Sequence, residues 1–132
     1  MMASCVIVPS AAAAQNCLHG TSSTEEQKAR KKGALSAARQ VNTLQANGSV
    51  ANKGTYLTQL QMSELYAAQL KKRPAATTLS FDRSAEILPG WQLTFDLTER
   101  GYWFMIKDRT DPCGFAYVSN ENGIIYTAEP IR

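Results

Sequence analysis

The most regular hydrophobic pattern lies in the C-terminal third of the chain. Residues 91–97 alternate between apolar and polar side chains, which is the period of a half-buried β-strand. Turn sequences separate this segment from three more apolar stretches, and one of the turns, 120–123, contains the Asn-Gly pair typical of a tight hairpin. The predicted strands are 91–97, 102–107, 114–119 and 124–127. The pattern therefore predicts a four-stranded antiparallel β-meander within residues 91–128.

A second periodicity, of three and four residues, predicts a helix over residues 24–47. Ser22, Ser23 and Thr24 each precede a Glu or Gln by three positions, which is the pattern of a capping box at a helix start. Asn47-Gly48 predicts the helix end, because glycine readily adopts the left-handed cap conformation. The apolar stripe consists of Ala34, Ala37, Ala38, Val41 and Leu44. Such a narrow, alanine-rich stripe favours close packing of an amphipathic helix on a sheet.

The length of 132 residues favours one domain. We expect residues 1–23 to form a leader or disordered arm, and residues 48–90 a variable connector with a short helix within 58–71 and a short strand at 78–81. All aromatic residues except Tyr56 follow residue 60, which places most of the core in the C-terminal half. The predicted class is α+β, with an N-terminal helix packed on a C-terminal antiparallel meander.

The N-terminal segment indicates an exported protein. Residues 3–14 are apolar apart from a break at Pro9, and Ala12-Ala13-Ala14 fits an A-x-A cleavage site of a secretory signal. No Lys or Arg precedes the segment, so the basic start of a usual signal is missing, and a loose arm is the alternative. The apolar run is shorter than the roughly 20 residues that a membrane span requires.

The net charge of +3 is too small to indicate nucleic-acid binding by itself. Much of the excess lies in one predicted helical turn, at Lys28, Arg30, Lys31 and Lys32. Such a run is usually a solvated helix face. The alternative is a surface that binds DNA or another anionic partner.

The three cysteines, Cys5, Cys17 and Cys113, form no C-x-x-C pair of the kind found in metal and redox sites. If Cys5 is removed with a leader, Cys17 and Cys113 remain as an even pair. They could then close a disulfide in an oxidising compartment. Two unrelated thiols are the alternative.

The sequence gives little support for catalysis. His19 is the only histidine, and it lies in the polar arm, where a catalytic triad or metal site would lack its other members. Asp108 and Asp111 match no calcium-loop spacing and are better explained as turn residues. We therefore predict no catalytic residue, metal or cofactor.

The aromatic residues Trp91, Trp103, Phe104 and Tyr117 have strand spacing, which is more typical of a core. The alternative is an aromatic binding surface for sugars or single-stranded nucleic acid. Trp103 and Tyr102 are adjacent on one predicted strand, so they point to opposite faces. Whichever of the two points away from the helix would offer an aromatic surface for sugars or single-stranded nucleic acid.

The order of one helix, a variable middle and a terminal antiparallel meander resembles type IV pilins and pseudopilins. Residues 28–45 are similar to the second half of a pilin helix, with an "R-x-x-N-T-x-Q" pattern at Arg39–Gln45 followed by a Gly-Tyr segment at 53–60. The C-terminal motifs that carry the resemblance are Gly101-Tyr102-Trp103-Phe104, the segment 111–117 and the segment 119–126. The resemblance covers about residues 25–132.

This resemblance implies a non-enzymatic subunit of a bacterial filament or secretion system, located in the periplasm or at the cell surface, with other protein subunits as partners. The chain departs from the family at residues 1–24, where neither a prepilin cleavage site nor the long apolar helix with its glutamate is found. The alternative function is a soluble exported ligand-binding module that uses the basic helix face or exposed aromatics.

Overall fold

A computed structural model describes residues 18, 24–75 and 77–128 of the chain. These residues form two helices and a four-stranded antiparallel sheet, which confirms the α+β class. The elements in chain order are α2 (Glu25–Ala51), α3 (Gln59–Lys72), β1 (Trp91–Leu97), β2 (Tyr102–Asp108), β3 (Ala116–Asn120) and β4 (Tyr126–Ala128).

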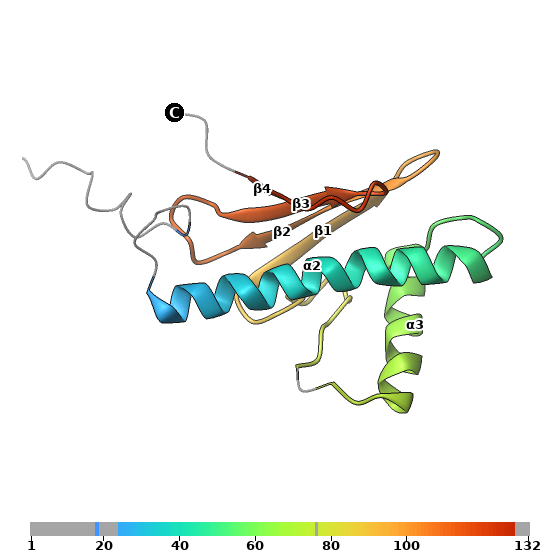
Figure 1. Cartoon of the computed structure of the whole chain (residues 1–132), viewed down its shortest axis with the longest axis horizontal. Helices are drawn as coiled ribbons and strands as arrows, with labels where there is room; N and C mark the ends of the chain where they lie inside the picture. Colours follow the sequence, from blue (N-terminus) through green and yellow to red (C-terminus); the bar gives the residue numbers. More distant parts are fainter. Residues whose placement is uncertain (1–17, 19–23, 76, 129–132) are drawn as a thin grey trace, which may run out of the picture.

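The strand order in the sheet is β1-β2-β3-β4, and each strand is antiparallel to the next (Figure 1). β1 and β2 pair over their whole length, from Trp91 opposite Asp108 to Leu97 opposite Tyr102. The predicted turn at 120–123 forms, since the Gly123 N–H donates to the Asn120 carbonyl and Gly123 adopts a φ of 77°. The hairpin is wider than predicted, because the first pair between β3 and β4 is Val118 with Tyr126.

The starts of two strands and the short segment 78–81 differ from the prediction. β4 begins at Tyr126 rather than residue 124. β3 begins at Ala116 rather than residue 114, because Asp111 accepts the backbone N–H groups of Gly114 and Phe115 in a turn. Residues 78–81 form no strand. There the Leu79 N–H donates to the Tyr66 hydroxyl and the Phe81 carbonyl accepts from the Gln59 side chain, so α3 satisfies backbone groups that a strand would have paired.

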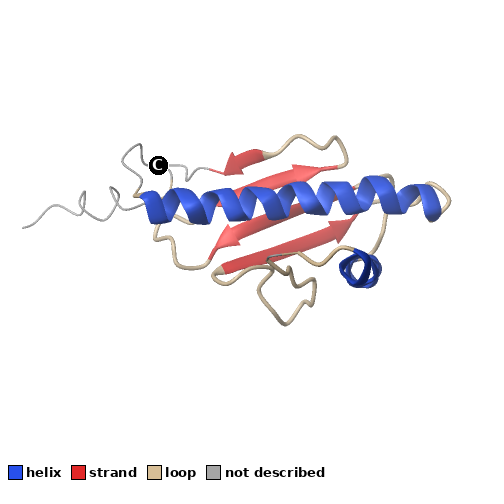
Figure 2. Ribbon diagram, turned by 60° about the horizontal axis from the view of Figure 1, so that its bottom comes forward, coloured by secondary structure: helices blue, strands red, loops and turns tan. Residues whose placement is uncertain are grey.

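Helix α2 lies along one face of the sheet (Figure 2). It begins where the sequence predicts, because Thr24 and Gln27 form a reciprocal capping box. The predicted apolar stripe is buried, and it belongs to the same core as the inward-facing aromatic side chains of the sheet. The buried residues of α2 are Ala34, Ala37, Ala38, Val41, Leu44, Gln45 and Gly48.

The predicted end of this helix at residue 47 is wrong, since α2 continues to Ala51. Gly48 is a buried helical residue that makes room for Leu57: a Cβ at this position would lie 2.8 Å from Leu57 Cγ and nearer still to its Cδ1. The left-handed backbone comes later, at Lys53 and Gly54. Gly48 therefore serves packing rather than helix termination.

Helix α3 begins at a second capping box, between Thr58 and Gln61, and agrees with the predicted short helix within 58–71. It runs across α2 near its C-terminal end (Figure 1). The connection between the helices is fixed by the buried Gln45 side chain, which donates to the Leu57 carbonyl at 2.8 Å and accepts the Leu57 N–H at 2.7 Å.

The two glycines of α2 give a matched test of this packing. Replacing Gly33, whose Cβ position is open, with Ala should raise the free energy of unfolding by about 0.5–1 kcal/mol through helix propensity. Gly48→Ala should lower it, because the added methyl group displaces Leu57 from a close-packed core. Urea denaturation followed by circular dichroism measures both, and equal stabilisation by the two substitutions would contradict the packing role of Gly48.

Candidate interaction surfaces

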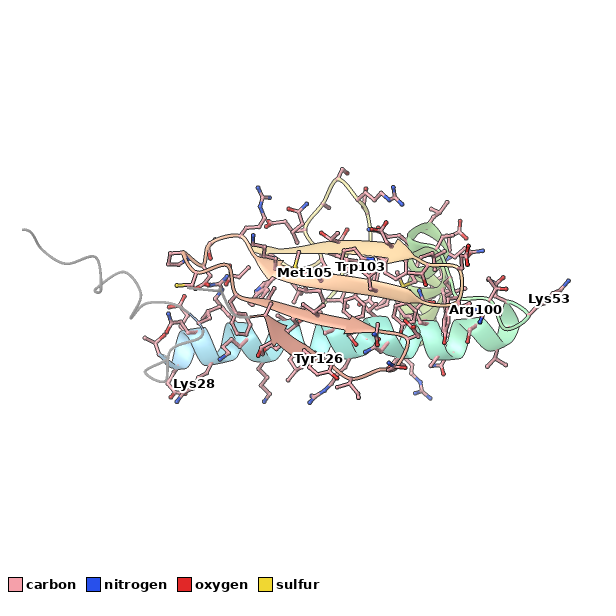
Figure 3. The ribbon with its side chains drawn as sticks, turned by 90° about the horizontal axis from the view of Figure 1, so that it is seen from above. Lys28, Lys53, Arg100, Trp103, Met105 and Tyr126 are labelled. Carbon is pink, nitrogen blue, oxygen red and sulfur yellow. The ribbon has the colours of Figure 1, made fainter. Side chains whose placement is uncertain are left out.

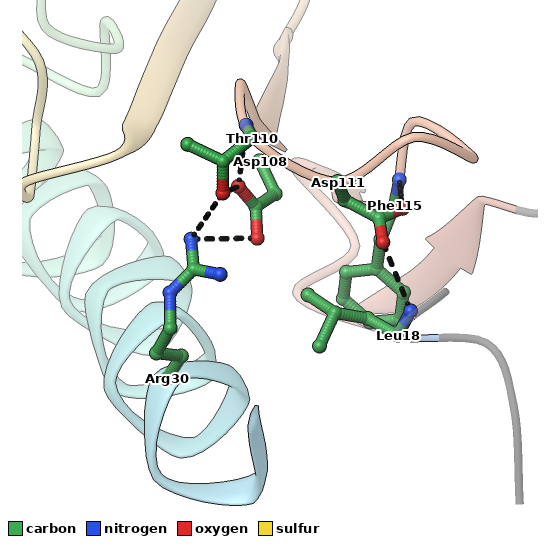
Figure 4. Close-up of polar contacts among 6 residues, drawn as sticks. All are labelled: Leu18, Arg30, Asp108, Thr110, Asp111 and Phe115. Atoms are coloured by element: carbon green, nitrogen blue, oxygen red, sulfur yellow. Dashed lines mark hydrogen bonds and ion pairs between the residues drawn. The ribbon is translucent and has the colours of Figure 1, made fainter. Parts of the chain in front are cut away.

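The predicted basic surface divides into inward-facing and outward-facing side chains. Arg30 points toward the end of the sheet, where its Nη2 lies 2.7 Å from Asp108 Oδ2 and donates to Thr110 Oγ1 at 3.1 Å (Figure 4). Its guanidinium carbon lies 5.6 Å from the centre of the Trp91 ring, a cation–π distance. Arg30 therefore connects α2 with the sheet.

The partner of Arg30, Asp108, has a fully buried side chain. Its Oδ1 accepts hydrogen bonds from the Thr110 N–H at 2.9 Å and the Thr110 hydroxyl at 2.8 Å, whereas among the described residues Oδ2 faces only the Arg30 guanidinium. Burial acts to raise the pKa of Asp108, but the bonds from Thr110 and the charge of Arg30 outweigh burial and hold the pKa below its ordinary value. Asp108 is thus a buried, ionised carboxylate.

Lys31 also faces inward. Its ammonium group donates to the Leu18 carbonyl at 3.0 Å and lies 5.0 Å from the centre of the Phe115 ring. The Leu18 N–H in turn donates to Asp111 Oδ1 at 3.0 Å, while Asp111 Oδ2 accepts the Phe115 N–H at 2.8 Å (Figure 4). Leu18 is buried by these contacts. Lys31 and Asp111 therefore hold Leu18 against the sheet end.

The two remaining basic residues of the predicted surface are exposed. Lys28 forms an ion pair with Glu25 at 3.1 Å in the first turn of α2, and Lys32 lies one turn further on. The exposed part of the basic run therefore carries less positive charge than its sequence indicates, because Arg30 and Lys31 serve internal contacts.

Cys113 is disulfide-bonded. Its predicted partner, Cys17, and the only histidine, His19, lie outside the described residues. The pairing of Cys17 with Cys113 stays a prediction. Leu18, which follows Cys17 in the sequence, is fixed beside the loop 109–115 that carries Cys113.

The sheet face opposite to α2 carries an exposed aromatic row. Trp103 points away from the helix with 38% of its surface exposed, whereas Tyr102 is buried and donates its hydroxyl to Asn42 Oδ1 at 2.7 Å. Figure 3 views this face, with Trp103, Met105 and Tyr126 labelled. Met105 pairs with Val118, which pairs with Tyr126, so these side chains form a continuous row over three strands. We call the four residues Trp103, Met105, Val118 and Tyr126 the outer sheet patch.

Of the four predicted core aromatics, Trp91, Phe104 and Tyr117 are buried. The prediction is wrong for Trp103, because its position on β2 directs the side chain to the sheet face opposite to α2. Two features carry no local sequence signal. One is the pair of polar contacts of Asn42, which donates to Ser119 Oγ at 3.1 Å and accepts from Tyr102. The other is a cleft of about 770 Å³ between α2, α3 and the connector. No local motif could have revealed the cleft, because three separate segments form its walls.

The described residues contain no group of three His, Cys, Asp or Glu side chains that could hold a metal ion. Neither α2 nor α3 combines the length and the apolar character that crossing a bilayer requires. Comparison of the chain with protein-family models, curated proteins and solved structures gives no match.

Arg30 and Lys28 provide a matched test of the internal ion pair. Arg30→Met should lower the free energy of unfolding by about 3 kcal/mol, because it leaves the buried Asp108 carboxylate without its cation. Lys28→Met should cost less than about 1 kcal/mol, since its ion pair is exposed. Urea denaturation at neutral pH measures both variants, and similar costs would contradict the role given to Arg30.

The lowered pKa of Asp108 predicts a loss of stability in acid. The folded state holds the ionised form more strongly than the unfolded state does, so this contribution is present above pH ~4 and disappears as the pH falls through the folded pKa. The Asp108→Asn variant should have a lower free energy of unfolding than the wild type at neutral pH. Its free energy of unfolding should also fall less than that of the wild type between neutral pH and pH ~3. Asp96→Asn, an exposed change on β1, is the control. Equal losses for Asp108→Asn and wild type would refute this assignment.

Proposed function

We propose that the chain is a non-enzymatic structural or interaction subunit that resembles a type IV pilin or pseudopilin component of a filament or secretion system. In this proposal an amphipathic α2 packs on a four-stranded meander, and the protein acts in the periplasm or at the bacterial cell surface. The supporting observation is that α2 lies along one face of the C-terminal sheet while the other face exposes Trp103 and Tyr126. The sheet face that α2 does not cover would bind neighbouring protein subunits.

The roles of Asn42 and Gln45 support this proposal. Both belong to the "R-x-x-N-T-x-Q" pattern on which the resemblance depends. Asn42 joins α2 to β2 and β3 through Tyr102 and Ser119, and Gln45 joins α2 to the segment that precedes α3. The pattern therefore contains two of the polar side chains that fix the helix to the rest of the domain.

We assign the contacts with partner subunits to the outer sheet patch. Its aromatic residues Trp103 and Tyr126 are 38% and 59% exposed. Covering them with another subunit would remove apolar surface from water.

A soluble ligand-binding module is the second candidate, and the exposed Trp103 is the observation that favours it. Stacking on one aromatic side chain suits a sugar or an unpaired base. The DNA-binding form of this candidate is weaker, since Arg30 and Lys31 form internal contacts and Lys28 pairs with Glu25.

Site-specific photo-crosslinking in the native bacterium tests the proposed function. A benzophenone amino acid at position 103 should crosslink to another protein subunit of the cell envelope, because the outer sheet patch is the assigned contact surface. The same amino acid at position 83, an exposed connector site, is the control and should crosslink much less. Recovery of only uncrosslinked protein from position 103 would refute a subunit function that uses this face.

A further inference from the structure

A cleft lies beside α2. It has a volume of about 770 Å³, within the range of small-molecule sites. Residues of α2, of α3 and of the connector that follows α3 line it. Its apolar walls come from all three segments and consist of Ala37, Tyr66, Leu70, Ala75, Leu79 and Leu88.

The cleft is elongated along α2. Its lining extends from Gly33 to Asn47, a rise of roughly 20 Å along the helix. This side of α2 is open because Gly33 has no side chain and Ser36 has a small one. The opposite wall is fixed in place, because the Leu79 N–H donates to the Tyr66 hydroxyl at 3.1 Å and ties the connector to α3. The shape suits a long, thin ligand.

The charged residues of the cleft are all cations. Lys72 and Arg73, at the C-terminal end of α3, line the cleft and are exposed, and its lining contains neither Asp nor Glu. The remaining polar side chains, such as Gln40 and Gln69, are neutral. A ligand that matches these walls has an apolar body and an anionic group at one end.

We propose that this cleft binds a single-chain anionic amphiphile such as a fatty acid. The acyl chain would lie between α2 and the Tyr66–Leu79 wall, and the carboxylate would face Lys72 and Arg73. A peptide helix, with a diameter of about 10 Å, needs a wider groove than an acyl chain does. This site is separate from the outer sheet patch, so it goes beyond the proposed function.

Displacement of dansyl-labelled undecanoate from the full-length protein tests the proposal, at concentrations below micelle formation. Dodecanoate should displace the probe saturably, with one molecule bound per chain. Octanoate should bind more weakly, because it buries fewer methylene groups. Dodecanol should also bind more weakly, because it lacks the carboxylate.

Two pairs of variants locate the binding site. Lys72→Gln combined with Arg73→Gln should weaken dodecanoate binding about tenfold at low salt, whereas Lys71→Gln, a neighbouring exposed position that does not line the cleft, should leave it unchanged. Ser36→Trp should block binding by filling the cleft, whereas Ala29→Trp, an exposed α2 position outside it, should not. Circular dichroism confirms that each variant is folded.

Either of two results would overturn the proposal: no saturable dodecanoate binding, or binding that Ser36→Trp and the double Lys72/Arg73 variant leave intact. Saturable binding of an acidic peptide in place of dodecanoate would also overturn it and would assign the cleft to a protein partner. The crosslinking at position 103 does not involve the cleft, so failure here and failure of the subunit function are distinguishable.

Discussion

The contact between Arg30 and Asp108 determines how α2 sits on the sheet. Asp108 ends β2 opposite Trp91, and its buried carboxylate needs a cation. The adjacent Arg109 does not provide it, because Arg109 pairs with Glu86. Arg30 provides that cation from α2 and also covers the Trp91 ring. Since an unpaired charge in this position is costly, arrangements that shift α2 along or around its axis are disfavoured.

A second polar contact fixes the other end of the interface. Asn42 forms hydrogen bonds with Ser119 and Tyr102. It lies about 18 Å from Arg30 along the axis of α2. Between the two lies a stripe in which alanine predominates. It lets the helix approach the sheet closely but buries little apolar area per residue. We infer that packing brings the layers together and that the two polar contacts set the register. The Gln45–Leu57 contact then positions α3, and with it the cleft.

The sequence was informative where a signal is local. Alternation predicted β1 with its observed bounds, and the capping-box pattern placed the start of α2 within residues 22–24. Strand alternation required Tyr102 and Trp103 to face opposite ways. Gly48 misled the prediction of the helix end, because its role depends on Leu57 in a later segment. The role of Arg30 was equally hidden, since its partner lies in a distant strand. The sequence of a basic run does not distinguish charges that face solvent from charges that face a buried carboxylate.

Native-state hydrogen exchange followed by NMR tests most directly whether α2 and the sheet form one cooperative unit. The account predicts that backbone amides of Val41 and Leu44 in α2 and of Phe104 and Ile106 in β2 exchange with the same free energy of opening, equal to that of global unfolding. Both groups of residues belong to one buried core. Exchange of the α2 amides at a clearly lower free energy than the β2 amides would contradict the account, because α2 would then detach while the sheet stays folded.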